Sequence, residues 1–165
     1  MNQDQDMHMK YQVKMNKTSH EYFMNEALKE AQKAFDKDEV PVGAVVVLDG
    51  KIIARAHNLR ESKQDFSAHA EFIAMQKAAK KIGSWRLENA LVYVTLEPCS
   101  MCAGAMIQSR IKHLYYGAKD IKAGAVESVL KLLDNRFNHQ VIYEGGLEAT
   151  KASNLLKEFF KKLRV

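Results

Sequence analysis

Cysteine, proline and tryptophan are scarce in this sequence. Of 165 residues, two are cysteine, two are proline and one is tryptophan. Two close cysteines in an intracellular protein are more often metal ligands or redox groups than a structural disulfide, and no apolar run approaches the roughly 18 residues that span a membrane. The N-terminal residues are polar and lack the apolar segment of a secretory signal. We therefore expect a cytoplasmic protein that has no membrane partner.

The remaining composition is typical of one globular domain. Hydrophobic residues make up 47% of the chain and charged residues 27%, which are ordinary values for a protein with its own core. A chain of this length can bury one such core. Residues 1–17 are polar without any periodic pattern, so we expect a disordered tail there and a single domain over residues 18–165.

The net charge of +5 makes the protein mildly basic. Basic residues cluster in KAAKK at 77–81 and in KEFFKKLRV at the end of the chain. This balance permits a polyanionic partner such as a nucleic acid. A solvated lysine-rich surface explains the charge equally well, so charge alone does not decide between the two.

Hydrophobic periodicity predicts alternating helices and strands. Strands are expected at residues 42–48, 51–57, 91–96, 111–117 and 140–143, the first two joined by a tight Asp49-Gly50 turn. Helices are expected at residues 18–37, 68–82, 98–109, 126–133 and 147–163. In these helices we expect Ile82 to face the core and His20 to face solvent.

This order of elements predicts an α/β fold with three α/β/α layers, in which helices flank a central mixed five-stranded sheet. The strand at 42–48 is apolar almost throughout, so we expect it to be buried on both faces.

Both cysteines lie three residues apart, directly after a proline. Proline suits the first turn of a helix, so a helix that opens at Pro98 would carry Cys99 and Cys102 on one face of its first turn. The partial positive charge of that helix end favours thiolates. Two thiolates on one face form half of a zinc site.

A third ligand is expected from His69, which begins the helix that precedes the strand leading to Pro98. Three protein ligands leave one tetrahedral position open, as in catalytic rather than structural zinc sites. Glu71 follows two residues later and points away from His69 on an ideal helix. Unless His69 precedes the first full helical turn, Glu71 is therefore expected to carry protons rather than bind the metal. Together these groups predict hydrolysis at a carbon that bears an amine.

Other interpretations of the cysteine pair remain open. A redox dithiol or a structural zinc site would explain Cys99 and Cys102 but would leave His69 and Glu71 without a role. His-x-Glu followed by Pro-Cys-x-x-Cys is the signature of zinc nucleobase deaminases. In this chain His69 and Cys99 are thirty positions apart, and each half of the signature stands next to an expected strand and helix.

At these residues the chain resembles the bacterial tRNA-specific adenosine deaminases. The matching segments, which span residues 19–164, include EVPVGAV at 39–45, SAHAE at 67–71, VYVTLEPCSMCAGAM at 92–106, YGAKD at 116–120 and FFKKLR at 159–164. AGAVES at 123–128 departs from the run of small residues expected in that loop. The resemblance implies a cytidine-deaminase-like fold, a homodimer, one Zn²⁺ per subunit, and deamination of adenosine to inosine at the wobble position of a tRNA anticodon.

The resemblance also assigns residues to these roles. His69, Cys99 and Cys102 match the zinc ligands, and Glu71 matches the proton shuttle. Residues that match contacts with the RNA are Asn58 for the target nucleotide, Val42 for the flipped base, Asp120 for the backbone, and Phe159, Phe160 and Arg164 for the anticodon loop. Asp120 has an alternative role in capping the turn before Gly124, and either phenylalanine has an alternative role in sealing the core.

Three functions stay open at this point, none of which requires DNA. A deaminase of a tRNA anticodon stem-loop uses the basic aromatic C-terminal helix, whereas a deaminase of free guanine, cytosine or dCMP does not require that helix. A non-catalytic RNA-binding module stabilised by zinc has no use for Glu71.

Overall fold

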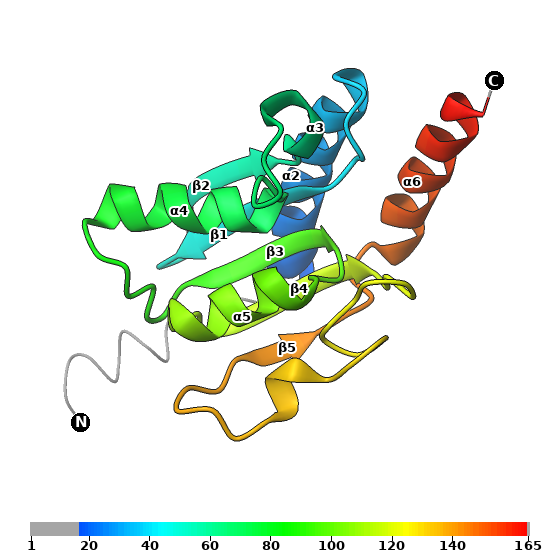
Figure 1. The fold of residues 1–165 in the computed structure, drawn as a ribbon. Helices are drawn as coiled ribbons and strands as arrows, with labels where there is room; N and C mark the ends of the chain where they lie inside the picture. Colours follow the sequence, from blue (N-terminus) through cyan, green and yellow to red (C-terminus); the bar gives the residue numbers. More distant parts are fainter. Residues whose placement is uncertain (1–16, 165) are drawn as a thin grey trace.

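A computed structural model describes residues 17–164 (Figure 1). The tail predicted for residues 1–17 lies outside this range except for Lys17, which is the first residue of helix α2 (Lys17–Asp36). No helix within residues 17–164 is long and apolar enough to cross a membrane.

The first two strands form the predicted hairpin. Strand β1 (Gly43–Leu48) pairs with the antiparallel strand β2 (Lys51–His57). The turn residues Asp49 and Gly50 both have positive φ, at 52° and 75°, as a two-residue turn matched to the strand twist requires.

Three further strands complete the sheet. Strands β3 (Leu91–Leu96), β4 (His113–Ala118) and β5 (Ile142–Glu144) follow in the chain, and the strand order is β2-β1-β3-β4-β5. Strand β1 is antiparallel to β3, whereas β3, β4 and β5 run parallel. The predicted mixed five-stranded sheet is therefore confirmed.

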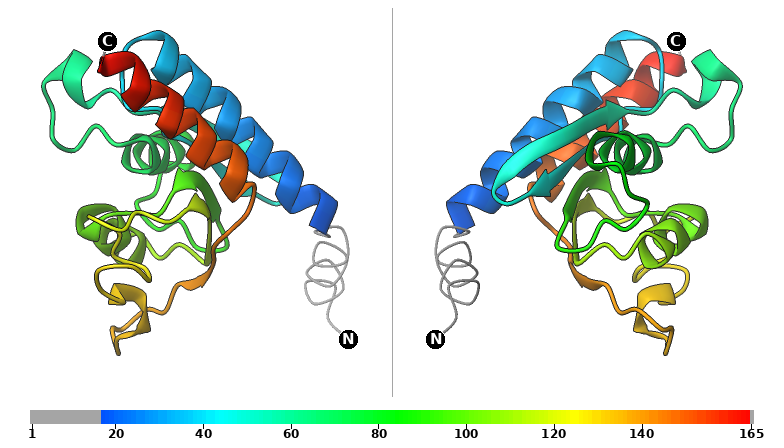
Figure 2. Two further views of the ribbon diagram at one scale, coloured as in Figure 1. Left: turned by 90° about the vertical axis from the view of Figure 1, so that its right-hand side faces the viewer. Right: turned by 90° about the vertical axis from the view of Figure 1, so that its left-hand side faces the viewer.

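Helices cover both faces of this sheet, which confirms the predicted three layers. Helices α4 (Ala70–Ile82) and α5 (Ser100–Gln108) lie in front of it in Figure 1. Helices α2 and α6 (Ala149–Leu163) lie side by side on the other face, as the left view in Figure 2 shows. Helix α2 approaches β1 so closely that a Cβ on Gly43 would lie 2.0 Å from the carbonyl oxygen of Ala27.

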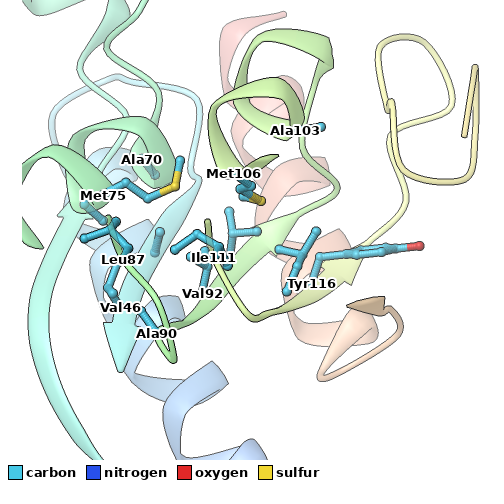
Figure 3. Close-up of a cluster of buried hydrophobic side chains, with 14 of the residues drawn as sticks. Val46, Ala70, Met75, Leu87, Ala90, Val92, Ala103, Met106, Ile111 and Tyr116 are labelled. Carbon is cyan, nitrogen blue, oxygen red and sulfur yellow. The ribbon is translucent and has the colours of Figure 1, made fainter. Parts of the chain in front are cut away.

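The larger hydrophobic core lies between the sheet and helices α4 and α5 (Figure 3). Val46 and Val92 from the sheet pack there with Met75 of α4 and Met106 of α5. A smaller cluster under α2 includes Val45, the neighbour of Val46. Strand β1 is thus buried on both faces, as its apolar sequence predicts.

Three local predictions outside the candidate site were wrong. Residues 126–133 form turns that lead into a short 3-10 helix, η1 (Leu132–Asp134), rather than a helix, because the backbone amides of residues 126–128 bond to the carboxylate of Glu97. Ile82 is 40% exposed at the end of α4. His20 is half-buried, and its Nδ1 lies 2.6 Å from the hydroxyl oxygen of Tyr93.

Candidate metal centre and substrate pocket

The segments that carry the predicted site residues meet at one edge of the sheet. Strands β3 and β4 run parallel, so the residues that follow them, Glu97 and the Lys119–Asp120 pair, lie at the same edge. Strand β1 is antiparallel to β3, so it begins here, after Val42, and the end of its partner β2 brings Asn58 beside it. Ligand sites in open α/β sheets form at this carboxyl edge.

Two helices point their N-termini toward this edge. His69 is the N-cap of α4, with extended backbone at φ −80° and ψ 148°. Cys99 is the N-cap of α5, at φ −75° and ψ 176°. Helix α5 therefore begins at Ser100 and not at Pro98 as predicted, because Cys99 stays extended. Cys102 lies in the first turn, where the helix dipole favours negatively charged groups.

The side chains of His69, Cys99 and Cys102 converge on one point. Their ligand atoms all lie within 4.8 Å of one another, and His69 Nδ1 lies 3.6 Å from Cys99 Sγ and 3.5 Å from Cys102 Sγ. A tetrahedral zinc ion with bonds of about 2.3 Å to sulfur and about 2.0 Å to nitrogen requires about 3.5 Å between the nitrogen and each sulfur. The donor types and their spacing thus fit a zinc ion.

The two thiols differ in acidity. A hydrogen bond with Cys102 lowers the pKa of Cys99 to about 4; burial opposes this effect and the neighbouring His69 reinforces it. The same hydrogen bond, together with burial, raises the pKa of Cys102 above its ordinary value. Cys99 is therefore ready to bind a cation as thiolate, and binding would release the proton of Cys102, since metal ligands must be deprotonated.

Glu71 lies beside this group without belonging to it. The carboxylate is not among the three converging ligands; its side chain forms a hydrogen bond with Cys102. Glu71 is only 4% exposed, and burial raises the pKa of its carboxyl group to about 7. A carboxyl group of this acidity can both accept and donate a proton near neutral pH.

A pocket of about 180 Å³ opens over these residues. Six of the predicted site residues line it, namely Val42, Asn58, His69, Glu71, Cys99 and Asp120.

One wall of the pocket is built from the segment after β2. Asn58 is buried, donates from Nδ2 to the carbonyl oxygen of Val40 at 3.2 Å and accepts from the backbone N–H of Arg60 at 3.1 Å. Glu39, which is 1% exposed, accepts from the backbone N–H groups of Glu61 and Ser62 at 2.9 and 3.1 Å. These bonds fix the short helix α3 (Arg60–Lys63) at the rim, inside the segment that the sequence predicts as a loop.

The two C-terminal phenylalanines have different surroundings. Phe159 is 2% exposed and packs edge-on against Phe35 of α2, with ring centroids 5.9 Å apart. Its side chain therefore belongs to the core and offers no face to an RNA base in this arrangement. Phe160 is 44% exposed, and Arg164, at the end of α6, is exposed as well.

A family model for MafB19-like deaminases matches residues 18–164 of this chain. The tRNA-specific adenosine deaminase of Bacillus subtilis (strain 168) is 50% identical over 148 residues, which cover 89% of this chain and 92% of that protein. The chain belongs to the tRNA-specific adenosine deaminase family. The family resemblance seen in the sequence is therefore confirmed.

Solved structures of related deaminases share the fold. One from a study of A-to-I editing by tRNA:A34 deaminases at the wobble position has a TM-score of 0.79 and 44% identity, covering 81% of this chain and 98% of that one. A guanine deaminase from Bacillus subtilis is more distant, with a TM-score of 0.59, 31% identity, and coverage of 75% of this chain and 88% of that one. The predicted cytidine-deaminase-like fold is confirmed.

The structure also adds pocket residues that sequence reasoning missed. Arg60, Glu97 and Ala123 line the pocket, although none was assigned a role. Glu97 carried a signal in the sequence: an acidic residue directly after the apolar strand Leu91–Leu96 has to find hydrogen-bond donors if it is buried.

Proposed function

We propose that this protein is a zinc-dependent hydrolase that converts adenosine to inosine at the wobble position of a tRNA anticodon. The proposal rests on the convergence of His69, Cys99 and Cys102 beside the buried carboxyl group of Glu71, in a chain of the adenosine deaminase family. Three protein ligands leave one tetrahedral position free. A site that served only to staple the fold would close that position with a fourth protein ligand.

His69, Cys99 and Cys102 would hold the zinc ion, one per subunit. When bound, zinc acidifies a coordinated water so that a hydroxide nucleophile is available near neutral pH. Glu71 would carry two protons in turn, the first from the attacking water to the purine ring nitrogen and the second from the hydroxyl group added to the base carbon to the departing amine. The net reaction consumes one water and releases one ammonia, which leaves a carbonyl group on the base.

The pocket and the last helix would bind the RNA. Val42 would pack against the extruded base, Asn58 would hydrogen-bond the target nucleotide, and Asp120 lies where the RNA backbone would pass. Phe160 and Arg164 would meet the anticodon loop as a stacking face and a phosphate contact. This division of labour is supported by the position of the first three at the pocket and by the exposure of the last two.

We propose that the protein works in the cytoplasm as a homodimer. An apolar groove of about 170 Å³ between α4 and α5 offers a surface for a second copy. Trp85 lines this groove and is 58% exposed, with the guanidinium group of Arg86 4.8 Å from its ring centroid. Trp85→Glu should convert the dimer to a monomer in light scattering; a monomeric unaltered protein would contradict the proposal.

The substrate class is tested by offering the purified protein an anticodon stem-loop with a wobble adenosine and, separately, free guanine, cytosine, adenosine and dCMP. We expect inosine from the RNA and no turnover of the small molecules. Turnover of free guanine with inert RNA would instead assign the protein to the activity of its guanine deaminase relative. A stem-loop in which guanosine replaces the wobble adenosine is the matched control.

A further inference from the structure

Glu97 is a buried carboxylate at the pocket that the proposed chemistry does not use. It is 2% exposed and stands between the end of β3 and Cys99. No ion pair among the described residues includes it. A carboxylate buried without a cation needs hydrogen-bond donors to offset the loss of water.

Those donors come from a single segment, residues 120–128. Oε1 accepts from the backbone N–H of Asp120 at 3.1 Å and from the Ser128 hydroxyl group. Oε2 accepts from the backbone N–H groups of Val126, Glu127 and Ser128 at 3.1, 2.8 and 3.0 Å. A carboxylate has about four lone-pair sites, so five donors saturate it. Glu97 has no acceptor capacity left for substrate or for water.

The segment is also fitted to the carboxylate sterically. A Cβ on Gly124 would lie 2.3 Å from Cδ of Glu97 and 2.4 Å from Oε2, so only glycine allows the loop to close over this group. The backbone N–H of Ala125 donates to the carbonyl oxygen of Pro98 at 2.8 Å, and that of Glu97 donates to Ala118 at 2.8 Å. Residues 121–129 contain neither helix nor strand.

The same segment forms a wall of the pocket. Asp120 and Ala123 line it together with Asn58 and Arg60. The Asp120 side chain accepts from the backbone N–H of Ala123 at 3.1 Å, so the position of Ala123 follows that of Asp120, and the Asp120 N–H is held by Glu97.

We propose that Glu97 is a positioning residue for the deamination reaction: its carboxylate gathers the amides of residues 120–128 and fixes them as one wall of the substrate pocket. The role in catalysis rests on the proposed function. The hydrogen bonds from residues 120–128 to the Glu97 carboxylate, called the clamp from here on, are a property of the fold, and they can be measured without substrate.

Glu97→Gln is the first test. The amide group can keep the bonds to residues 126–128 only if its NH₂ replaces Oε1, where it meets another donor at Asp120. Loss of a buried hydrogen bond to a charged group changes a local opening equilibrium by about tenfold or more. We therefore expect amide hydrogen exchange in residues 120–128 to accelerate about tenfold or more.

Zinc content should stay at that of the unaltered protein. KM for the anticodon stem-loop should rise by about tenfold, with kcat changed less, because the wall binds substrate away from the reacting atoms. Glu30→Gln is the matched control: Glu30 is 3% exposed, but its partners are Lys33, Arg55 and His57, on the α2 side of the sheet. In Glu30→Gln, the amide exchange rates of residues 120–128 and the KM for the stem-loop should equal those of the unaltered protein.

Gly124→Ala tests the same contact by changing the loop instead of the carboxylate, since the added methyl group would displace the Glu97 carboxylate. It should reproduce the faster exchange and the higher KM, and the double variant should be no worse than the more affected single variant. Unchanged exchange in Glu97→Gln would overturn the clamp. Faster exchange with unchanged KM and kcat would overturn the role in positioning, as would loss of zinc or failure to fold when Glu30→Gln folds. If the unaltered protein makes no inosine, the proposed function fails, while the exchange data still decide the clamp.

Discussion

Phe159 and Phe160 are adjacent on helix α6, and substituting them one at a time separates the contribution of α6 to stability from its proposed contribution to RNA binding. Phe159 is buried against Phe35, whereas Phe160 is 44% exposed. We expect Phe159→Ala to destabilise the fold without a specific effect on RNA, and Phe160→Ala to weaken RNA binding without destabilising the fold.

The magnitudes follow from the two environments. Truncation of a buried phenylalanine costs about 3–5 kcal/mol, and in a domain of this size each kcal/mol lowers Tm by about 2–4 °C, so Phe159→Ala should lower Tm by about 6–20 °C. A change at an exposed position stays within about 0.5 kcal/mol. Loss of one stacked base costs about 1–3 kcal/mol of binding, so Phe160→Ala should raise Kd for the stem-loop about 5- to 150-fold.

Thermal unfolding measures the first effect, and fluorescence anisotropy with a labelled anticodon stem-loop at fixed salt measures the second. Phe160→Leu serves as a control that keeps apolar bulk but removes the aromatic face; it should bind like Phe160→Ala. Equal Kd values for Phe160→Ala and the unaltered protein would refute the stacking role. A Tm loss larger in Phe160→Ala than in Phe159→Ala would refute the assignment of the core side chain.

Three further outcomes are expected. Glu71→Ala should keep zinc and the fold but lower kcat by about 10²- to 10⁴-fold, since a proton carrier is removed; residual activity near the original would contradict the shuttle role. Cys99→Ser should lower zinc content by atomic absorption because a thiolate ligand is lost, and unchanged content would exclude this ligand set. Burial lowers the pKa of His113 to about 4, so the folded state holds it neutral, and its contribution to stability is present above pH 6.5 and lost as the pH falls toward 4. His113→Phe should therefore show a flatter decline of unfolding free energy between pH 6.5 and 4; an identical slope would contradict this reasoning.

Local sequence signals predicted the parts of the molecule that depend on neighbouring residues. The hairpin follows from Asp49-Gly50, whose positive φ values the pair tolerates. The metal centre follows from two short motifs because each ligand caps or opens a helix within its own motif, and the sheet then brings the helix ends together.

The errors lie where a distant partner decides the local structure. Val126, Val129 and Leu130 have apolar spacing that indicates a helix, but the carboxylate of Glu97, some thirty residues away in sequence, takes the amides of residues 126–128. His20 has the position of an exposed first-turn residue, yet Tyr93, 73 residues along the chain, binds its ring. No window of neighbouring residues contains either contact.

The proposed metal ligands and proton carrier stand at the ends of helices that pack on the sheet, whereas two segments that line the pocket, residues 58–63 and 120–128, are each held by a single carboxylate, Glu39 and Glu97. The residues proposed to carry out the reaction and the segments proposed to select the base therefore belong to different parts of the chain. Related enzymes could differ in these two pocket segments, and therefore in the base that they bind, while the metal-binding residues and Glu71 stay the same. Grafting such segments between relatives is a direct route to new nucleobase preferences.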